Sequence, residues 1–280
     1  MKKPLLFVLL SFFLMTACRQ TSEGDRSVST FSSRSTSAAT ASDKVKKPVK
    51  DSVVIDLLKQ KVGRGVSEIK LVRRSYVCSY NKQTRTPNWV AWTLTRDHTY
   101  GNIQRDNERF EEDTSVPEPR ATFQDFYNSR YDRGHMCPAG DNKWDAEAMK
   151  QTFLMTNICP QNHGLNKEYW NELEIQCRTW ARRFGEITVV CGPLFEDGEP
   201  RLIGRNKVRV PTGFFKVVYC HMPEPKAIAF IFRNNGTPQP WREKVVSVDE
   251  VEHRTGFDFL YMLPDVVENK IEAVDDLKGW

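Results

Sequence analysis

The sequence predicts an α+β domain built around a largely antiparallel β-sheet. Three observations predict this fold class: several apolar runs typical of strands, one long segment with helical periodicity, and no alternation of strands and helices of the kind that forms a parallel sheet. The chain has 280 residues, of which 39% are hydrophobic and 11% aromatic, which is sufficient for a hydrophobic core. We therefore expect a globular protein with mixed secondary structure.

Residues 1–18 have the pattern of a secretory signal peptide. Two lysines precede an apolar run at residues 5–15, which is too short to span a bilayer and is followed by a Thr-Ala-Cys sequence. A small residue before a cysteine is typical of a bacterial lipoprotein cleavage site, at which Cys18 would carry the lipid; an ordinary signal cleaved nearby is the alternative. Both interpretations predict export to the periplasm or cell surface, and the first adds a lipid anchor in the bacterial membrane.

Residues 19–55 predict a disordered tether. Twelve of the 22 residues 21–42 are Ser or Thr, and four of the seven residues 44–50 are lysines, so this segment has little apolar surface to bury. The folded domain is therefore expected at residues 56–280. The formal net charge of +5 is only a weak indication of anionic partners, because nucleic-acid binding depends on a clustered basic face.

The elements of the domain begin with a predicted antiparallel strand pair. Residues 76–80 and 89–95 are rich in β-branched and aromatic side chains and flank a polar turn at residues 81–87. Residues 165–184 repeat apolar side chains at helical spacing, and Gly185 provides a C-terminal stop. Residues 187–191, 214–219 and 227–232 predict buried strands separated by turns that contain Gly and Pro.

Six cysteines after residue 18 indicate disulfides. They are Cys78, Cys137, Cys159, Cys177, Cys191 and Cys220. An even number in an exported protein is typical of a disulfide framework, although the pattern selects no pairing and buried thiols are the alternative for some of them. Cys159 and His163 could instead bind zinc, but no C-x-x-C pair is present to complete such a site.

Polar residues of the kinds used in catalysis are concentrated between residues 131 and 174. They are Asp132, Arg133, His135, Asn157, Gln161, Asn162, His163, Asn166 and Glu174. Asn166 precedes Trp170 by four residues and Glu174 follows it by four, so both lie beside the predicted buried face of the helix. An amide and a carboxylate in such a position are unfavourable unless something binds them.

These side chains fit the requirements of phosphodiester hydrolysis. Eight helical residues span about 12 Å, so Asn166 and Glu174 cannot both bind one cation directly. We expect Asn166 to bind Mg²⁺ directly and Glu174 to act through water, with Mn²⁺ or another divalent cation as alternatives. His135 would then be the general base and Arg133 the second positive charge. The alternatives are a core histidine at position 135 and a surface ion pair between Arg133 and Asp132.

The same residues belong to a longer series of motifs. Asp132-Arg133-Gly134-His135 is followed by TNICPQ at 156–161 and LNKEYWNELE at 165–174, and further segments match at 89–92, 190–193, 210–212, 215–217, 247–252 and 255–256. In this order the chain from Tyr76 to its end resembles the DNA/RNA non-specific endonuclease family, which includes secreted bacterial nucleases and mitochondrial endonuclease G. The resemblance implies a ββα-metal, or His-Me finger, endonuclease domain.

The resemblance also implies residue roles. His135 would activate the attacking water, Asn166 bind the metal, Glu174 orient metal-bound water, Arg133 contact the scissile phosphate and Asn157 help to position the site. A further family arginine is matched best by Arg109, with Arg105 and Arg120 as alternatives. The implied substrates are DNA and RNA, because such a site contacts backbone phosphate. A homodimer and an unidentified inhibitor are compatible with the resemblance.

Two other functions are compatible with parts of the sequence. One is a catalytically inactive nucleic-acid-binding surface lipoprotein of the same fold, and the other is a zinc-stapled surface protein. The retained His135 and Asn166 argue against the first, and the missing C-x-x-C pair argues against the second. Cys137, two residues after His135, departs from the family pattern, and a disulfide from it would constrain the finger.

Overall fold

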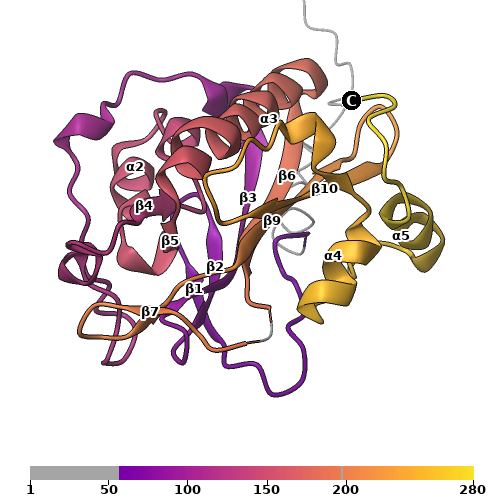
Figure 1. The fold of residues 1–280 in the computed structure, drawn as a ribbon. Coiled ribbons are helices and arrows are strands. Elements are labelled where there is room, and N and C mark those ends of the chain that lie inside the picture. The colour runs from indigo at the N-terminus through magenta and orange to yellow at the C-terminus, as the bar shows by residue number, and fades with distance from the viewer. Residues whose placement is uncertain (1–56, 197) are drawn as a thin grey trace, which may run out of the picture. The chain divides into compact units, whose positions relative to one another are not determined.

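A seven-stranded antiparallel sheet forms the centre of the domain, as the sequence predicts (Figure 1). The structure is a computed structural model that describes residues 57–196 and 198–280, so the predicted signal peptide, the lipidation site and the tether lie outside the described residues. The strand order is β1-β2-β3-β6-β9-β10-β11. The strands are β1 (Ile69–Val72), β2 (Val77–Asn81), β3 (Thr86–Thr95), β6 (Glu186–Leu194), β9 (Gly213–Cys220), β10 (Lys226–Arg233) and β11 (Val245–Val246).

The predicted strands are confirmed in position and direction. β2 and β3 form the expected antiparallel pair, with Val77 opposite Ala91. The three later predicted strands are β6, β9 and β10, which are neighbours in the middle of the sheet. Their sequences are nearly continuous apolar runs because helices cover both faces of the sheet, so that side chains on either side are buried.

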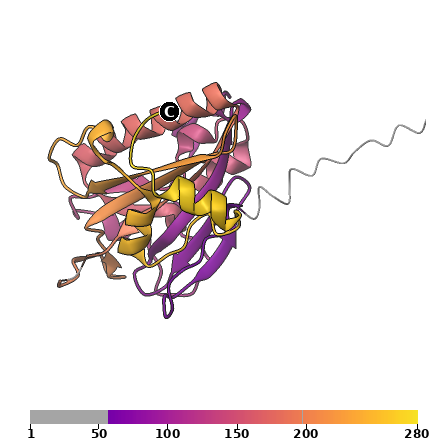
Figure 2. The same ribbon diagram turned by 90° about the vertical axis from the view of Figure 1, so that its right-hand side faces the viewer.

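Helices lie against both faces of the sheet (Figures 1 and 2). α3 (Asn171–Phe184) packs on one face through a core that includes Leu173 and Trp180. α4 (Val248–Thr255) and α5 (Asp265–Glu272) pack on the other face through a second core. Alternate residues of each central strand enter the two cores, as expected for the period of two in a strand. None of the helices in the described part of the chain is long and apolar enough to cross a membrane.

A short hairpin and the start of the long helix form a separate ββα unit beside the α3 face of the sheet. β4 (Asp132–His135) pairs antiparallel with β5 (Ile158–Gln161). Between them lie η4 (Ala139–Asp141), α2 (Ala146–Thr152) and η5 (Met155–Asn157). The remaining elements are η1 (Asp97–Thr99), η2 (Arg105–Asn107) and η3 (Phe123–Phe126) in the β3–β4 connection, the β7 (Leu202–Ile203) and β8 (Val208–Arg209) ribbon, and η7 (Trp241–Glu243).

The predicted helix at 165–184 is confirmed, with one difference. Its first part, η6 (Leu165–Trp170), is a π-helix that continues into α3. The Asn162 side chain accepts a hydrogen bond from the Gly164 N–H at 3.0 Å and so satisfies one of the free amides at the helix start. Gly185 ends the helix with φ of 91°, a conformation that glycine adopts without strain.

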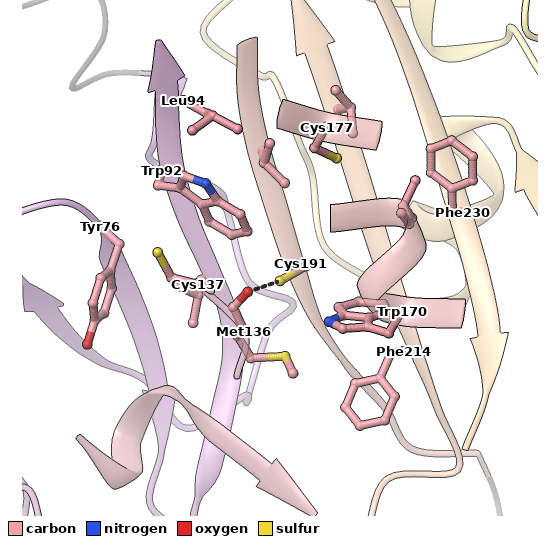
Figure 3. Close-up of a cluster of buried hydrophobic side chains, with 14 of the residues drawn as sticks. Tyr76, Trp92, Leu94, Met136, Cys137, Trp170, Cys177, Cys191, Phe214 and Phe230 are labelled. Atoms are coloured by element: carbon pink, nitrogen blue, oxygen red, sulfur yellow. Dashed lines mark hydrogen bonds between the residues drawn. The ribbon is translucent and has the colours of Figure 1, made fainter. Parts of the chain in front are cut away.

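The prediction of disulfides is wrong. All six cysteines between residues 57 and 280 are unpaired and buried, Cys137 included, so no disulfide constrains the finger. Figure 3 shows Cys137, Cys177 and Cys191 among apolar side chains of the α3-facing core, where the Cys191 thiol donates to the Met136 carbonyl at 3.3 Å. These cysteines serve as small apolar side chains.

The zinc hypothesis is also contradicted. Cys159 is fully buried, whereas His163 is exposed and its Nδ1 contacts the Asp132 carboxylate at 2.9 Å. Within the described residues, the only cluster of His, Cys, Asp and Glu ligands is formed by carboxylates on α4 and α5.

Candidate active site

A pocket of about 480 Å³ lies where the ββα unit meets the β3–β4 connection. Four of the predicted site residues line it: Arg133, His135, Asn166 and Glu174. The remaining lining residues are Arg105, Asp132, Pro138, Ala139, Gly140, Lys143, His163, Lys167, Asn171 and Arg178. The chain therefore folds so that residues from strand β4 (Asp132–His135) and from the long helix at residues 165–184 meet at one place.

His135 stands at the end of β4 with its ring held between two phenylalanines. The ring centroids of Phe110 and Phe153 lie 5.4 and 4.9 Å from that of His135. The Nε2 atom is buried and has no hydrogen-bond partner among the described residues. Burial, and then the charges of Arg105 and Arg133, lower the pKa of His135 to about 3. The imidazole is therefore neutral near pH 7, as a proton acceptor must be. Because Nε2 has no hydrogen-bond partner among the described residues, the alternative of a core histidine satisfied by hydrogen bonds is not supported at this atom.

Gly134 allows His135 to reach this position. A Cβ atom at Gly134 would lie 2.1 Å from Oε1 of Gln161, on the neighbouring strand β5. Gln161 is fully buried and leaves no space for a larger residue at position 134. The glycine of the Asp-Arg-Gly-His motif is thus required by packing within the hairpin.

The Arg133 guanidinium is held by aromatic rings. It lies 5.0 Å from the ring centroid of Phe110 and 4.7 Å from that of Phe123. Its Nε is buried without a hydrogen-bond partner among the described residues. The ion pair with Asp132 that was the alternative interpretation does not form, because that carboxylate binds Asn166 and His163. A guanidinium held in this way keeps donors available for an anionic ligand.

The Asp132 carboxylate holds the side chain of Asn166, a contact that the sequence did not predict. Its Oδ2 accepts hydrogen bonds from Asn166 Nδ2 and His163 Nδ1, both at 2.9 Å. Because the amide nitrogen of Asn166 is engaged, its Oδ1 is left to bind a cation. A carboxylate that orients a metal ligand is a common arrangement in metal sites. The available signal was the position of Asp132 at the start of the strand that carries His135.

The π-helical turn aligns Asn166 with Glu174. Eight residues of regular α-helix end about 80° away around the axis, since each residue adds about 100°. A π-turn accommodates one extra residue and so removes about one such step, which brings the two side chains to within about 20° of each other. Both side chains accordingly line the same pocket. The sequence predicted that both lie beside the buried face of the helix but not that a π-turn aligns them.

Glu174 is a half-buried carboxylate beside other charged groups. Burial raises its pKa to about 7, although the charges of Lys216 and Arg178 act in the opposite direction. Arg178 also donates to Asp141 at 2.7 Å, and Asp141 accepts from the Trp92 indole at 3.0 Å. Together with Asn166 Oδ1, Glu174 forms a set of oxygen donors that suits a hard divalent cation.

The pocket carries more positive than negative side chains. The basic residues that line it are Arg105, Arg133, Lys143, Lys167 and Arg178, and the acidic residues are Asp132 and Glu174. Such a surplus favours an anionic ligand. Lys143, Lys167 and Arg178 were not identified from the sequence, because isolated basic residues resemble ordinary surface charges.

Asn157 lies behind the pocket and does not line it. It is fully buried, its Oδ1 accepts from the Cys137 N–H at 2.9 Å, and its Nδ2 donates to the carbonyls of Cys137 and Thr152. It therefore fixes the backbone two residues after His135. This arrangement is compatible with the predicted positioning role.

The arginine candidates in the β3–β4 connection occupy different places. Arg105 lines the pocket together with His135. Arg109 lines a neighbouring depression that also includes Arg105 and Arg133. Arg120 forms ion pairs with Glu112 and Glu118 and lines another pocket. Of the three arginines, only Arg105 lines the pocket of His135, whereas the sequence favoured Arg109.

Comparisons with known proteins agree with this geometry. The family model described as DNA/RNA non-specific endonuclease matches residues 55–266. "Nuclease EXOG, mitochondrial" of Xenopus laevis is 37% identical over 68% of this chain and 57% of its own length. "Nuclease C1" of Cunninghamella echinulata var. echinulata is 37% identical over 70% of this chain and 84% of its own length. "Nuclease" of Nostoc sp. is 34% identical over 74% of this chain and 78% of its own length. The chain thus spans little more than half of the mitochondrial EXOG protein.

A solved structure supports the same fold. The crystal structure of the EndoG/EndoGI complex contains a chain with a TM-score of 0.68 and 27% sequence identity to this protein. The match covers 71% of this chain and 88% of that chain.

Proposed function

This chain belongs to the DNA/RNA non-specific endonuclease family, and we propose that it is a metal-dependent endonuclease that hydrolyses phosphodiester bonds in DNA and RNA. One observation carries the proposal: a neutral histidine with an unpartnered ring nitrogen lines the same basic pocket as an asparagine and a glutamate that can bind a cation. Base, cation site and phosphate-binding arginine are the parts that this hydrolysis requires.

In the proposed reaction, His135 takes a proton from a water molecule as the water oxygen attacks phosphorus. The new P–O bond forms while the bond to the leaving sugar oxygen breaks, and that oxygen leaves with a proton from solvent. The Phe110 and Phe153 rings hold the imidazole in one orientation. Arg133 and Arg105 would donate hydrogen bonds to the non-bridging oxygens, whose negative charge grows as the bond to water forms.

Asn166 Oδ1 would hold the divalent cation directly and Glu174 would contact its hydration shell. When bound, the cation supplies positive charge to the phosphate and the leaving oxygen. We propose Mg²⁺, because an amide oxygen with several waters suits an ion that loses its hydration reluctantly; Mn²⁺ would use the same donors. Asp132 supports this role by engaging the nitrogen of the Asn166 amide.

The first experiment is a gel assay of plasmid DNA and structured RNA with residues 19–280, in Mg²⁺ and in EDTA. We expect metal-dependent loss of both substrates. His135→Ala should reduce the rate by about 10² to 10⁴-fold with little change in DNA binding, since the base acts on water. His253→Ala, at an exposed position on α4, is the matched control and should retain full activity.

Two results would contradict the proposal. Unchanged cleavage by His135→Ala would remove the histidine from the mechanism. DNA binding by the folded wild-type protein without cleavage in any divalent metal would favour the inactive nucleic-acid-binding lipoprotein. Asn166→Ala should raise the Mg²⁺ concentration that gives half-maximal activity, and Glu174→Ala should lower turnover by disturbing the hydration shell.

We also propose that the chain is exported and carries a lipid on Cys18. The support is the sequence of residues 1–18, with its basic start, apolar run and Thr-Ala-Cys end. Radioactive palmitate labelling of the expressed full chain tests this proposal, because Cys18→Ala should lose both the label and its place in the membrane fraction. Equal labelling of the two proteins would contradict it.

A further inference from the structure

Three carboxylates meet between α4 and α5, on the face of the sheet opposite to α3. Asp249 and Glu252 are three residues apart on α4 and so share one side of that helix. Glu272 is the last residue of α5. One oxygen from each carboxylate lies within 4.8 Å of the other two. This cluster is separate from the pocket that contains His135, since none of its three members lines that pocket.

Glu272 is a buried carboxylate, and one of its oxygens has no hydrogen-bond partner among the described residues. Its side chain is only 4% exposed, and its Oε1 is buried without a hydrogen-bond partner among the described residues. Glu252 is half-buried and its Oε1 accepts from the Phe259 N–H at 2.6 Å. Burying a carboxylate without a partner is strongly unfavourable.

Two basic residues of this region, Lys61 and Arg254, are engaged with other carboxylates. Lys61 pairs with Asp258 at 2.7 Å, and Arg254 pairs with Glu250 at the same distance. The concentration of negative charge between the two helices is therefore not balanced by these side chains.

We propose that Asp249, Glu252 and Glu272 bind a calcium ion that is distinct from the catalytic cation. Ca²⁺ binds oxygen ligands at about 2.3–2.6 Å, so oxygens on opposite sides of the ion are up to about 5 Å apart, and the cluster fits within this limit. Ca²⁺ accepts several carboxylates in irregular geometry, whereas Mg²⁺ requires a near-ideal octahedron and is usually bound through one or two carboxylates. The ion would join α4 to α5 and so fix the C-terminal helix against the sheet.

Calcium binding can be measured independently of nuclease activity. Residues 19–280 carrying Asn166→Ala, which weakens the proposed catalytic cation site, are stripped with EDTA, dialysed and titrated with CaCl₂ by calorimetry and thermal unfolding. We expect one equivalent of Ca²⁺ to bind. At a Ca²⁺ concentration about 100 times Kd, Tm should rise by about 5 °C. Mg²⁺ at the same concentration should produce a smaller shift.

Variants of the cluster identify the ligands. In the same background, Glu272→Gln should lose the calcium-dependent rise in Tm. Its metal-free form should be at least as stable as the parent, because an unpartnered buried carboxyl group is replaced by a neutral amide of similar size. Asp249→Asn, at an exposed position, should weaken binding by at least tenfold without affecting folding. Glu250→Gln is the matched control on α4 and should retain the full shift, since Glu250 pairs with Arg254 outside the cluster.

Three results would overturn the assignment: no calcium binding in the Asn166→Ala background, an unchanged shift in both Glu272→Gln and Asp249→Asn, or tighter binding of Mg²⁺ than of Ca²⁺. With the natural Asn166 restored, Glu272→Gln should cleave DNA at the wild-type rate in saturating Mg²⁺. A loss of cleavage there would overturn the separation of the two sites.

Discussion

Gly134→Ala tests whether packing within the hairpin sets the position of the proposed base. The added Cβ would lie 2.1 Å from Oε1 and 2.7 Å from Cβ of Gln161. Ordinary contact begins near 3.4 Å, so the strands must separate by about 1.3 Å or Gln161 must leave its buried place. Overpacking of this kind destabilises by about 1–3 kcal/mol. Because His135 is the next residue, a displacement of about 1 Å should lower kcat/KM by about 10²-fold.

The assay combines urea unfolding with cleavage of a fluorescent duplex at low substrate concentration. Gly236→Ala is the control, since its added Cβ would meet nothing closer than 3.5 Å. Gln161→Ala removes the nearest obstructing atom, so the double variant Gly134→Ala/Gln161→Ala should recover part of the lost activity and show a coupling of about 1 kcal/mol. Wild-type activity in Gly134→Ala, or strictly additive losses in the double variant, would refute the packing argument.

Two further predictions concern acid stability and the thiols. Burial raises the pKa of Asp113, but hydrogen bonds from Ser115 and Thr156 and the charge of Arg73 outweigh it and leave the pKa below its usual value. Its charge therefore stabilises the fold at neutral pH, and this contribution is lost as the pH falls below about 4. In urea unfolding, Asp113→Asn should destabilise the protein at pH 7 but much less at pH 3. An equal loss of stability at both pH values would contradict this prediction. The six thiols of residues 19–280 should resist Ellman's reagent in the native state, because they are buried, and all should react after unfolding without reductant. Fewer than six would reveal a disulfide.

The sheet and the long helix could be predicted because their signals are local. β6, β9 and β10 are buried on both faces, and this produces apolar runs that are visible without any knowledge of the partner strands. Most of the candidate site was predictable for a related reason. His135, Asn166 and Glu174 come from a unit of β4, β5 and the long helix that is nearly continuous in sequence, so these residues can be recognised together as a motif.

Features that depend on distant contacts could not be predicted. The π-turn at 165–170 has no compositional signal, and it determines how Asn166 and Glu174 face the pocket. Whether a cysteine forms a disulfide or stays a free thiol depends on which core position it occupies. The number of cysteines alone indicated disulfides that do not form. Arg105 and Arg109 both lie in the irregular β3–β4 connection. The path of this connection decides which of them lines the pocket, and the sequence does not show that path.

Lys216 shows how the site extends into the core of the sheet. It interrupts the apolar run of β9, is fully buried, and has an Nζ without a hydrogen-bond partner among the described residues. Nζ lies 4.2 Å from the ring centroid of Trp170. Although burial lowers the pKa of Lys216, neighbouring thiols and the carboxylates of Glu174 and Asp141 raise it overall, so the lysine remains charged.

A charged lysine at this position is explained by the pocket above it. Glu174 and Asp141 bring two carboxylates toward the α3-facing core, and Arg178 binds only the second directly. Lys216 is the largest of the influences that lower the pKa of Glu174. An apolar residue at position 216 would pack well between Trp92 and Trp170. It would, however, leave Glu174 more strongly protonated and therefore a poorer ligand for a cation. The charge of Lys216 on β9 therefore favours the ionised form of Glu174 on α3. This accounts for a lysine at a position where the apolar pattern of the strand would otherwise exclude it.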